Sequence, residues 1–158
     1  MSLTVTSDSF AHGQRIPTKF TGDGQNISPG LRWTGVPQQA AELALIVDDP
    51  DAPMADPFVH WVLYKIPASA TTLPEGAGND AKSKAPAGVM QGRNSIKKPG
   101  YLGPAPPRGH GTHHYHFRLY ALDKPLDVHA GLDKTALLAA MSGHVLDEGE
   151  LVGTYDRA

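Results

Sequence analysis

"AELALIVDDPDAPMADPFVHWVLYKI", residues 41–66, is the stretch that decides the fold. Its first part, residues 41–47, is a continuous apolar run, which is typical of a buried strand. Its last part, residues 58–66, is β-branched and aromatic at both alternating sets of positions, which predicts a central strand covered on both faces. Between them, the acidic and proline-containing residues 48–53 predict a rigid turn. The stretch therefore predicts a sheet that is covered on each side.

The segments outside this stretch also have the pattern of short strands. The 158 residues include 17 glycines and 14 prolines, scattered between apolar runs without a repeat, which indicates strands joined by many turns. Further strands are predicted within residues 3–10, within residues 88–94 and at residues 150–155. Leu31 and Trp33 are predicted to point inward from a turn-rich segment, and the polar residues 67–88 are predicted to form an exposed connection.

Two C-terminal patterns complete the predicted fold. "HHYHFRLYALD", residues 113–123, predicts a long strand with Tyr115 and every second residue after it on the apolar face. Residues 133–146 have helical spacing, with Asp133 as the predicted N-cap and Leu137, Leu138, Met141 and Val145 on the apolar side. The fold class is therefore mostly β, an antiparallel β-sandwich with one C-terminal helix, in a single domain spanning residues 1–158.

Composition limits the function classes. The formal charge is −2, which makes nucleic acid and anionic membrane surfaces poor primary partners. Five spaced basic residues between Lys82 and Lys98 are predicted to lie on a solvated loop. The absence of cysteine excludes disulfides and thiol catalysis. Neither a signal peptide nor a membrane span is recognisable, so a cytoplasmic location is predicted.

The turn "DDPDAP", residues 48–53, and the strand after it carry the first candidate site residues. The simplest interpretation of the turn is that Asp49 and Asp51 cap their own backbone. His60, inside an apolar strand, needs a hydrogen-bond partner. That partner is either a backbone carbonyl or a carboxylate of the turn. A carboxylate would hold the ring in one tautomer and leave it able to donate to an anion.

"GYLGPAPPRGHGTHHYHF", residues 100–117, carries the second set of candidates. Its prolines stiffen a loop, and its glycines allow backbone amides to approach a ligand. His113 and Tyr115 share one face of the following strand and suit an oxyanion such as phosphate. His114 and His116 share the other face and suggest a metal, but a third ligand is lacking, so no metal and no cofactor are predicted.

No hydrolase motif is present. The chain lacks G-x-S-x-G and H-E-x-x-H, and no serine has an evident base beside it in the sequence. The protein is therefore predicted not to be an enzyme. A cryptic hydrolase that uses Asp49 and His60 as acid and base is the less favoured alternative.

Taken in order, these motifs resemble the phosphatidylethanolamine-binding protein family, which includes the Raf kinase inhibitor protein of animals, and especially its small bacterial branch. The family's D-P-D-x-P appears at residues 49–53, followed by His60, and its G-x-x-P-P-x-G-x-x-H-x-Y appears at residues 103–115. "DGQNISPGLRW" at residues 23–33, "MSGHVL" at residues 141–146 and "ELVGTY" at residues 150–155 also match. The resemblance covers nearly the whole chain.

The resemblance implies a β-sandwich with Greek-key connections and a pocket for phosphate, carboxylate or a phospholipid head group. Within it, His60 and His113 would donate to the anion and Asp49 would orient an imidazole. His110, His114 and His116 would lie at the surface or at an interface. A protein-interaction regulator that inhibits a kinase or protease is the alternative function, and a homodimer is plausible. Carried over residue by residue, the pocket would consist of Asp49, Asp51, Pro53, His60, Gly103, Pro106, His113 and Tyr115.

Overall fold

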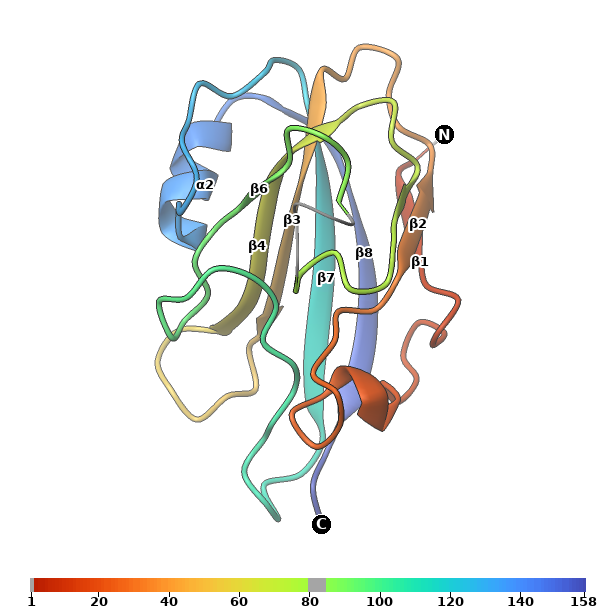
Figure 1. Ribbon diagram of the computed structural model, residues 1–158, viewed down its shortest axis with the longest axis vertical. Helices are drawn as coiled ribbons and strands as arrows, with labels where there is room; N and C mark the ends of the chain where they lie inside the picture. The colour runs from red at the N-terminus through yellow and green to blue at the C-terminus, as the bar shows by residue number, and fades with distance from the viewer. Residues whose placement is uncertain (1, 80–84) are drawn as a thin grey trace.

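Two antiparallel sheets and an α-helix make up the computed structural model, which describes residues 2–79 and 85–158 (Figure 1). Lys82 and Lys84, part of the predicted basic loop, lie outside the described residues. The elements in chain order are β1 (Thr4–Thr6), the 3-10 helix η1 (Thr18–Phe20), β2 (Leu31–Thr34), β3 (Glu42–Asp49), β4 (Phe58–Pro67), β5 (Thr72–Leu73), β6 (Met90–Gln91), β7 (His113–Leu122), α2 (Lys134–Met141) and β8 (Val145–Tyr155).

The larger sheet has the strand order β6-β4-β3-β7-β8, with β3 at its centre. Every residue of β3 is buried, as is most of β4, which confirms that residues 41–66 contain two central strands. The chain reaches β7 after a long connection and places it beside β3 rather than beside β6. This register brings Asp48, at the end of β3, opposite His116 of β7, and Asp49 opposite Phe58 of β4. The ends of three strands thus meet at one edge.

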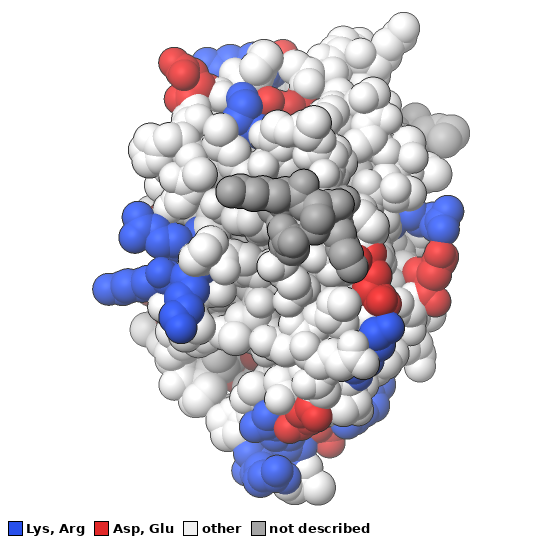
Figure 2. All heavy atoms as spheres, viewed as in Figure 1, with Lys and Arg blue, Asp and Glu red and all other residues white. Residues whose placement is uncertain are grey.

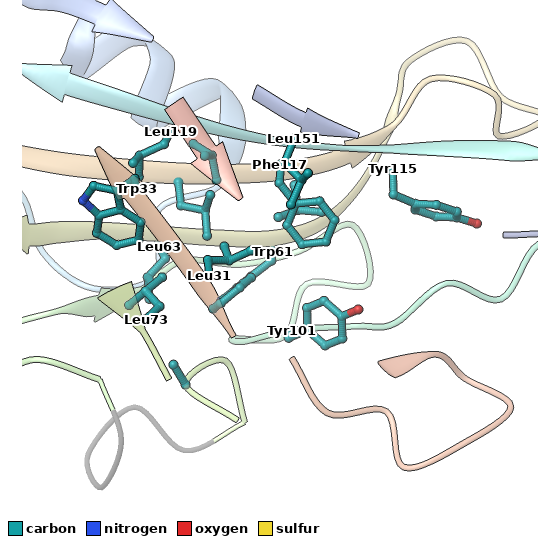
Figure 3. Packing of buried hydrophobic residues seen from close by; sticks show 14 of the residues in the cluster. Leu31, Trp33, Trp61, Leu63, Leu73, Tyr101, Tyr115, Phe117, Leu119 and Leu151 are labelled. Carbon is teal, nitrogen blue, oxygen red and sulfur yellow. The ribbon is translucent and has the colours of Figure 1, made fainter. Parts of the chain in front are cut away.

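A second sheet, β1-β2-β5, covers one face of the larger sheet. Leu31 and Trp33 of β2 point into the shared core, where they pack with residues of β4, β7 and β8 (Figure 3). On the other face, Leu137 and Met141 of α2 join a separate apolar cluster with Ala44 of β3. The structure confirms a mostly β sandwich with one C-terminal helix, because each face of the buried strands needed an apolar layer.

The helix is shorter than predicted. Asp133 caps it as expected, accepting a hydrogen bond from the backbone N–H of Ala136 at 2.8 Å. It ends at Met141, because Gly143 adopts a positive φ of 82° and β8 already begins at Val145. Val145 is consequently exposed rather than part of the apolar helix face.

The connection of residues 67–88, which was predicted to be exposed, is partly buried. Residues 72–73 form β5, whose Leu73 pairs with Leu31 of β2 and is fully buried. Ala77 is buried as well, whereas residues 80–84 of this segment lie outside the described part. A strand of two residues carries no recognisable alternation, so its sequence gave no signal.

The charged side chains on the surface and the length of the helices are as the small net charge and the short apolar runs of the sequence predict. Lys, Arg, Asp and Glu gather in small groups across the face seen in Figure 2, without a continuous basic surface there. Within residues 2–79 and 85–158, no helix has both the length and the apolar character that crossing a bilayer requires.

Candidate functional site

Three chain segments meet at one end of the sandwich and enclose a cavity of about 310 Å³. They are the turn after β3, the beginning of β4, and the loop that leads into β7, all at the lower end of Figure 1. Seven of the eight predicted site residues line this cavity; Asp51 does not. The seven are Asp49, Pro53, His60, Gly103, Pro106, His113 and Tyr115.

His60 is fixed by a backbone carbonyl. Its Nδ1 lies 2.6 Å from the carbonyl oxygen of Leu102, and because that oxygen can only accept, Nδ1 carries the hydrogen. Burial lowers the pKa of His60 below its ordinary value of 6.5, against the opposing effects of this hydrogen bond and of Asp49. The ring is therefore neutral near pH 7, and its Nε2 is a hydrogen-bond acceptor. Of the two partners that the sequence left open, the structure has the carbonyl.

Asp49 instead holds His113. Its Oδ2 accepts a hydrogen bond from Nδ1 of His113 at 2.6 Å, and its Oδ1 accepts one from the backbone N–H of Asp51 at 2.8 Å. Asp49 and His113 are both almost completely buried. The carboxylate therefore fixes the tautomer and the orientation of the imidazole, since Nδ1 must carry the hydrogen. Asp49 does orient an imidazole, as expected, and that imidazole is His113.

Tyr115 supplies a hydroxyl. Its ring meets that of His60 edge to face, with centroids 5.1 Å apart. Burial, and then the charge of Asp49, raise the pKa of Tyr115, so the phenol keeps its proton. Its hydroxyl points away from the packed core in Figure 3 and has no hydrogen-bond partner among the residues that the structure describes. It is therefore free to donate to a ligand.

The other acidic residues of the turn point elsewhere. Asp51 accepts hydrogen bonds from the backbone N–H and from Nδ1 of His114, both at 2.8 Å, outside the cavity. Burial alone would raise the pKa of Asp51, but these hydrogen bonds outweigh it and the pKa is lowered. Asp48 faces away from the cavity and pairs with Arg118 and Lys134. Successive residues of β7 point to opposite sides, so His113 and His114 lie on different faces of the strand. Asp51, which binds His114, therefore lies on the side away from His113.

The glycine in the cavity wall is required by close packing. A Cβ on Gly103 would lie 2.6 Å from both Oδ1 of Asn26 and the carbonyl oxygen of Phe20. Oδ1 of Asn26 also accepts the backbone N–H of Gly103 at 2.6 Å, so this amide is not free for a ligand. The loop is thus fixed against residues 20–26, which explains why the early D-G-x-N segment belongs to the same pattern.

Sequence reasoning missed several residues of the site. His110, which was expected to lie apart from the pocket, has its Nδ1 2.6 Å from Nε2 of His113. The spacing H-x-x-H across Gly111 was the available signal, but only the loop geometry brings the rings together. The remaining lining residues are mostly apolar, namely Ala52, Met54, Phe58, Leu102, Ala105 and Pro107.

A family model described as phosphatidylethanolamine-binding protein matches residues 6–156. The chain belongs to this family. A UPF0098 protein of Pyrococcus horikoshii is 46% identical over 99% of this chain and 78% of its own length. The crystal structure of YbcL of Escherichia coli, described as a new member of the mammalian family, aligns with a TM-score of 0.94 at 32% identity over 100% of both chains. A homologue from Chlamydia trachomatis aligns with a TM-score of 0.89 at 37% identity over 99% of both chains.

Family membership supports a binding protein of the phosphatidylethanolamine-binding type, and its relatives occur in archaea and bacteria. The relatives named above are not named as enzymes. A Mycobacterium tuberculosis relative, 40% identical over 98% of this chain and 72% of its own length, bears the name "Putative lipoprotein LppC". Because a relative bears that name, the cytoplasmic location stays a prediction.

Proposed function

We propose that this protein binds small anions of the phosphate-monoester or carboxylate type, without chemical turnover, in the cavity formed by the turn after β3, the beginning of β4 and the loop that leads into β7. The observation that carries the proposal is the placement of two imidazoles and one free phenol hydroxyl, from His60, His113 and Tyr115, around one cavity. Such groups can form charge-assisted hydrogen bonds with an oxyanion.

The cavity also indicates what the anion is attached to. A volume of about 310 Å³ is at the small end for ligand sites, so a head group fits and a large molecule does not. Met54 and Phe58 contribute apolar surface, and Met54 is 50% exposed at the mouth. An anionic group with a short apolar or phospholipid-like substituent matches this lining.

Charge balance implies that the ligand binds together with a proton. His60 presents an acceptor nitrogen, and Asp49 adds a buried negative charge close by. An anion oxygen cannot hydrogen-bond to an unprotonated Nε2. Either a monoanionic ligand brings its own hydroxyl hydrogen or the imidazole takes a proton from water. Affinity should therefore rise on acidification, by at most about tenfold per pH unit for one proton.

The acid–base pair of the hydrolase alternative is not supported by the contacts. Asp49 is engaged by His113, and His60 by a carbonyl, so the two do not act on each other directly. Among the described residues that line the cavity, Tyr115 is the single one with a hydroxyl group, and its raised pKa makes it a poor nucleophile. A kinase or protease partner, a homodimer and a cytoplasmic location stay predictions.

Calorimetric titration with phenyl phosphate tests the proposal. We expect saturable binding by the wild type and none by His60→Ala. We expect weaker binding by Tyr115→Phe, which removes only the free hydroxyl and so leaves the fold intact. His129→Ala is the matched control, because His129 is an exposed imidazole outside the cavity. Equal affinity of all four proteins, or turnover of the ester by the wild type, would contradict the proposal.

A further inference from the structure

His113 uses both of its ring nitrogens within the protein. Nδ1 donates to Asp49, so it is Nε2 that remains for other contacts. Nε2 lies 2.6 Å from Nδ1 of His110, and the two ring centroids are 4.8 Å apart. At that distance one hydrogen lies between the two nitrogens. Because Nδ1 of His113 already carries the hydrogen that it donates to Asp49, Nε2 of an uncharged His113 accepts this one from Nδ1 of His110. The nitrogen of His113 that a ligand would need is therefore already engaged.

The two imidazoles are held very differently. His113 is 1% exposed and fixed by a buried carboxylate. His110 is exposed and lies outside the cavity lining, between Gly109 and Gly111, which have positive φ values of 72° and 97°. A Cβ at either glycine would meet nothing within 4 Å, so there is open space around this part of the loop. His110 is thus the partner that can move away.

We propose that His110 is a built-in competitor of the ligand, which occupies Nε2 of His113 until an anion displaces it. This inference rests on the proposed function and adds a residue that tunes affinity without lining the cavity. An anion that brings a hydroxyl hydrogen to Nε2 of His113, or that accepts a hydrogen from Nε2 once the ring has taken up a proton, must first break the contact with His110. Loss of His110 removes that competition, so the affinity should increase.

The size of the gain follows from the hydrogen bond. A neutral hydrogen bond contributes a net stabilisation that corresponds to roughly a threefold to tenfold change in an equilibrium constant. We therefore expect His110→Ala to bind phenyl phosphate roughly threefold to tenfold more tightly than the wild type. His129→Ala, which changes an exposed imidazole elsewhere, should bind as the wild type does.

Two measurements on the full chain test this inference. The first is the NMR spectrum of the imidazole nitrogens without ligand, in which the Nε2 signal of His113 should shift in His110→Ala and not in His129→Ala. The second is calorimetric titration of the same three proteins with phenyl phosphate. An unshifted Nε2 signal, or equal or weaker binding by His110→Ala while the wild type binds, overturns the competition alone. Absence of binding by all three proteins overturns the proposed function as well.

Discussion

The contact between Asp49 and His113 should be worth more than an ordinary hydrogen bond. The side chains are 4% and 2% exposed, and the nitrogen and oxygen atoms are 2.6 Å apart. A hydrogen bond to a charged group contributes about 1.5–3 kcal/mol to stability. We expect a coupling free energy in that range from a double-mutant cycle. The assay is urea unfolding of the wild type, Asp49→Ala, His113→Ala and the double variant, analysed as free energies of unfolding.

The cycle isolates this contact from other losses. Asp49→Ala also removes the hydrogen bond from the backbone of Asp51 and leaves a small cavity, but these losses occur with or without His113 and cancel. A control cycle of Asp49→Ala with His129→Ala should be additive within about 0.5 kcal/mol. If the cycle with His113 is equally additive, the carboxylate does not hold this imidazole and the assignment of the pair is wrong.

Asp133→Ala should lower the free energy of unfolding by about 1 kcal/mol through loss of the helix cap, and Asp133→Asn by much less; equal losses would contradict the cap. Gly78→Ala places a Cβ 2.6 Å from Cβ of Tyr101 and should lower the free energy of unfolding by about 1–3 kcal/mol. Gly30→Ala meets only contacts of 3.4 Å or more and should lower it less. Urea unfolding of the two variants measures the difference, and equal losses would contradict the packing argument. The pKa of His60 is lowered in the folded protein, so the unfolded chain takes up a proton first as the pH falls through 6.5, and the free energy of unfolding decreases below that pH. In His60→Ala the free energy of unfolding should depend less steeply on pH in this range. An unchanged pH dependence would refute the argument.

The larger elements were predictable because their burial follows local patterns. Apart from Glu42, His60 and Lys65, residues 41–47 and 58–66 are apolar at both alternating sets of positions, and this pattern identifies β3 and β4 as central strands. The alternation after His113 identifies β7 and its inward face. The strand β5 has two residues, which is too short for a period, whereas the strand predicted within residues 88–94 is confirmed as the short β6. The end of the helix was predicted too late, because the helical spacing of apolar residues continues past Gly143, whereas the positive φ of Gly143 ends the helical backbone.

The sequence predicts which residues line the site, but it does not predict which of them form hydrogen bonds with one another. The motifs identify Asp49, His60 and His113 as neighbours, and all three line the cavity. Which carboxylate meets which imidazole depends on side-chain direction across strands, and Asp49 and His113 are 64 positions apart. No local spacing encodes that choice. The same reason explains Asp51, which turns to His114, and His110, whose contact depends on the path of a glycine-rich loop.

The number of protons taken up with the ligand tests the central claim most directly. Calorimetric titration of the wild type with phenyl phosphate, in two buffers with different ionisation enthalpies, measures this number. Because neutral His60 presents an acceptor nitrogen, the complex should hold up to one more proton than the free protein and the ligand dianion together. Affinity should accordingly increase from about pH 8 to about pH 6. Proton release, or an affinity that is constant or falls over this range, would contradict the account.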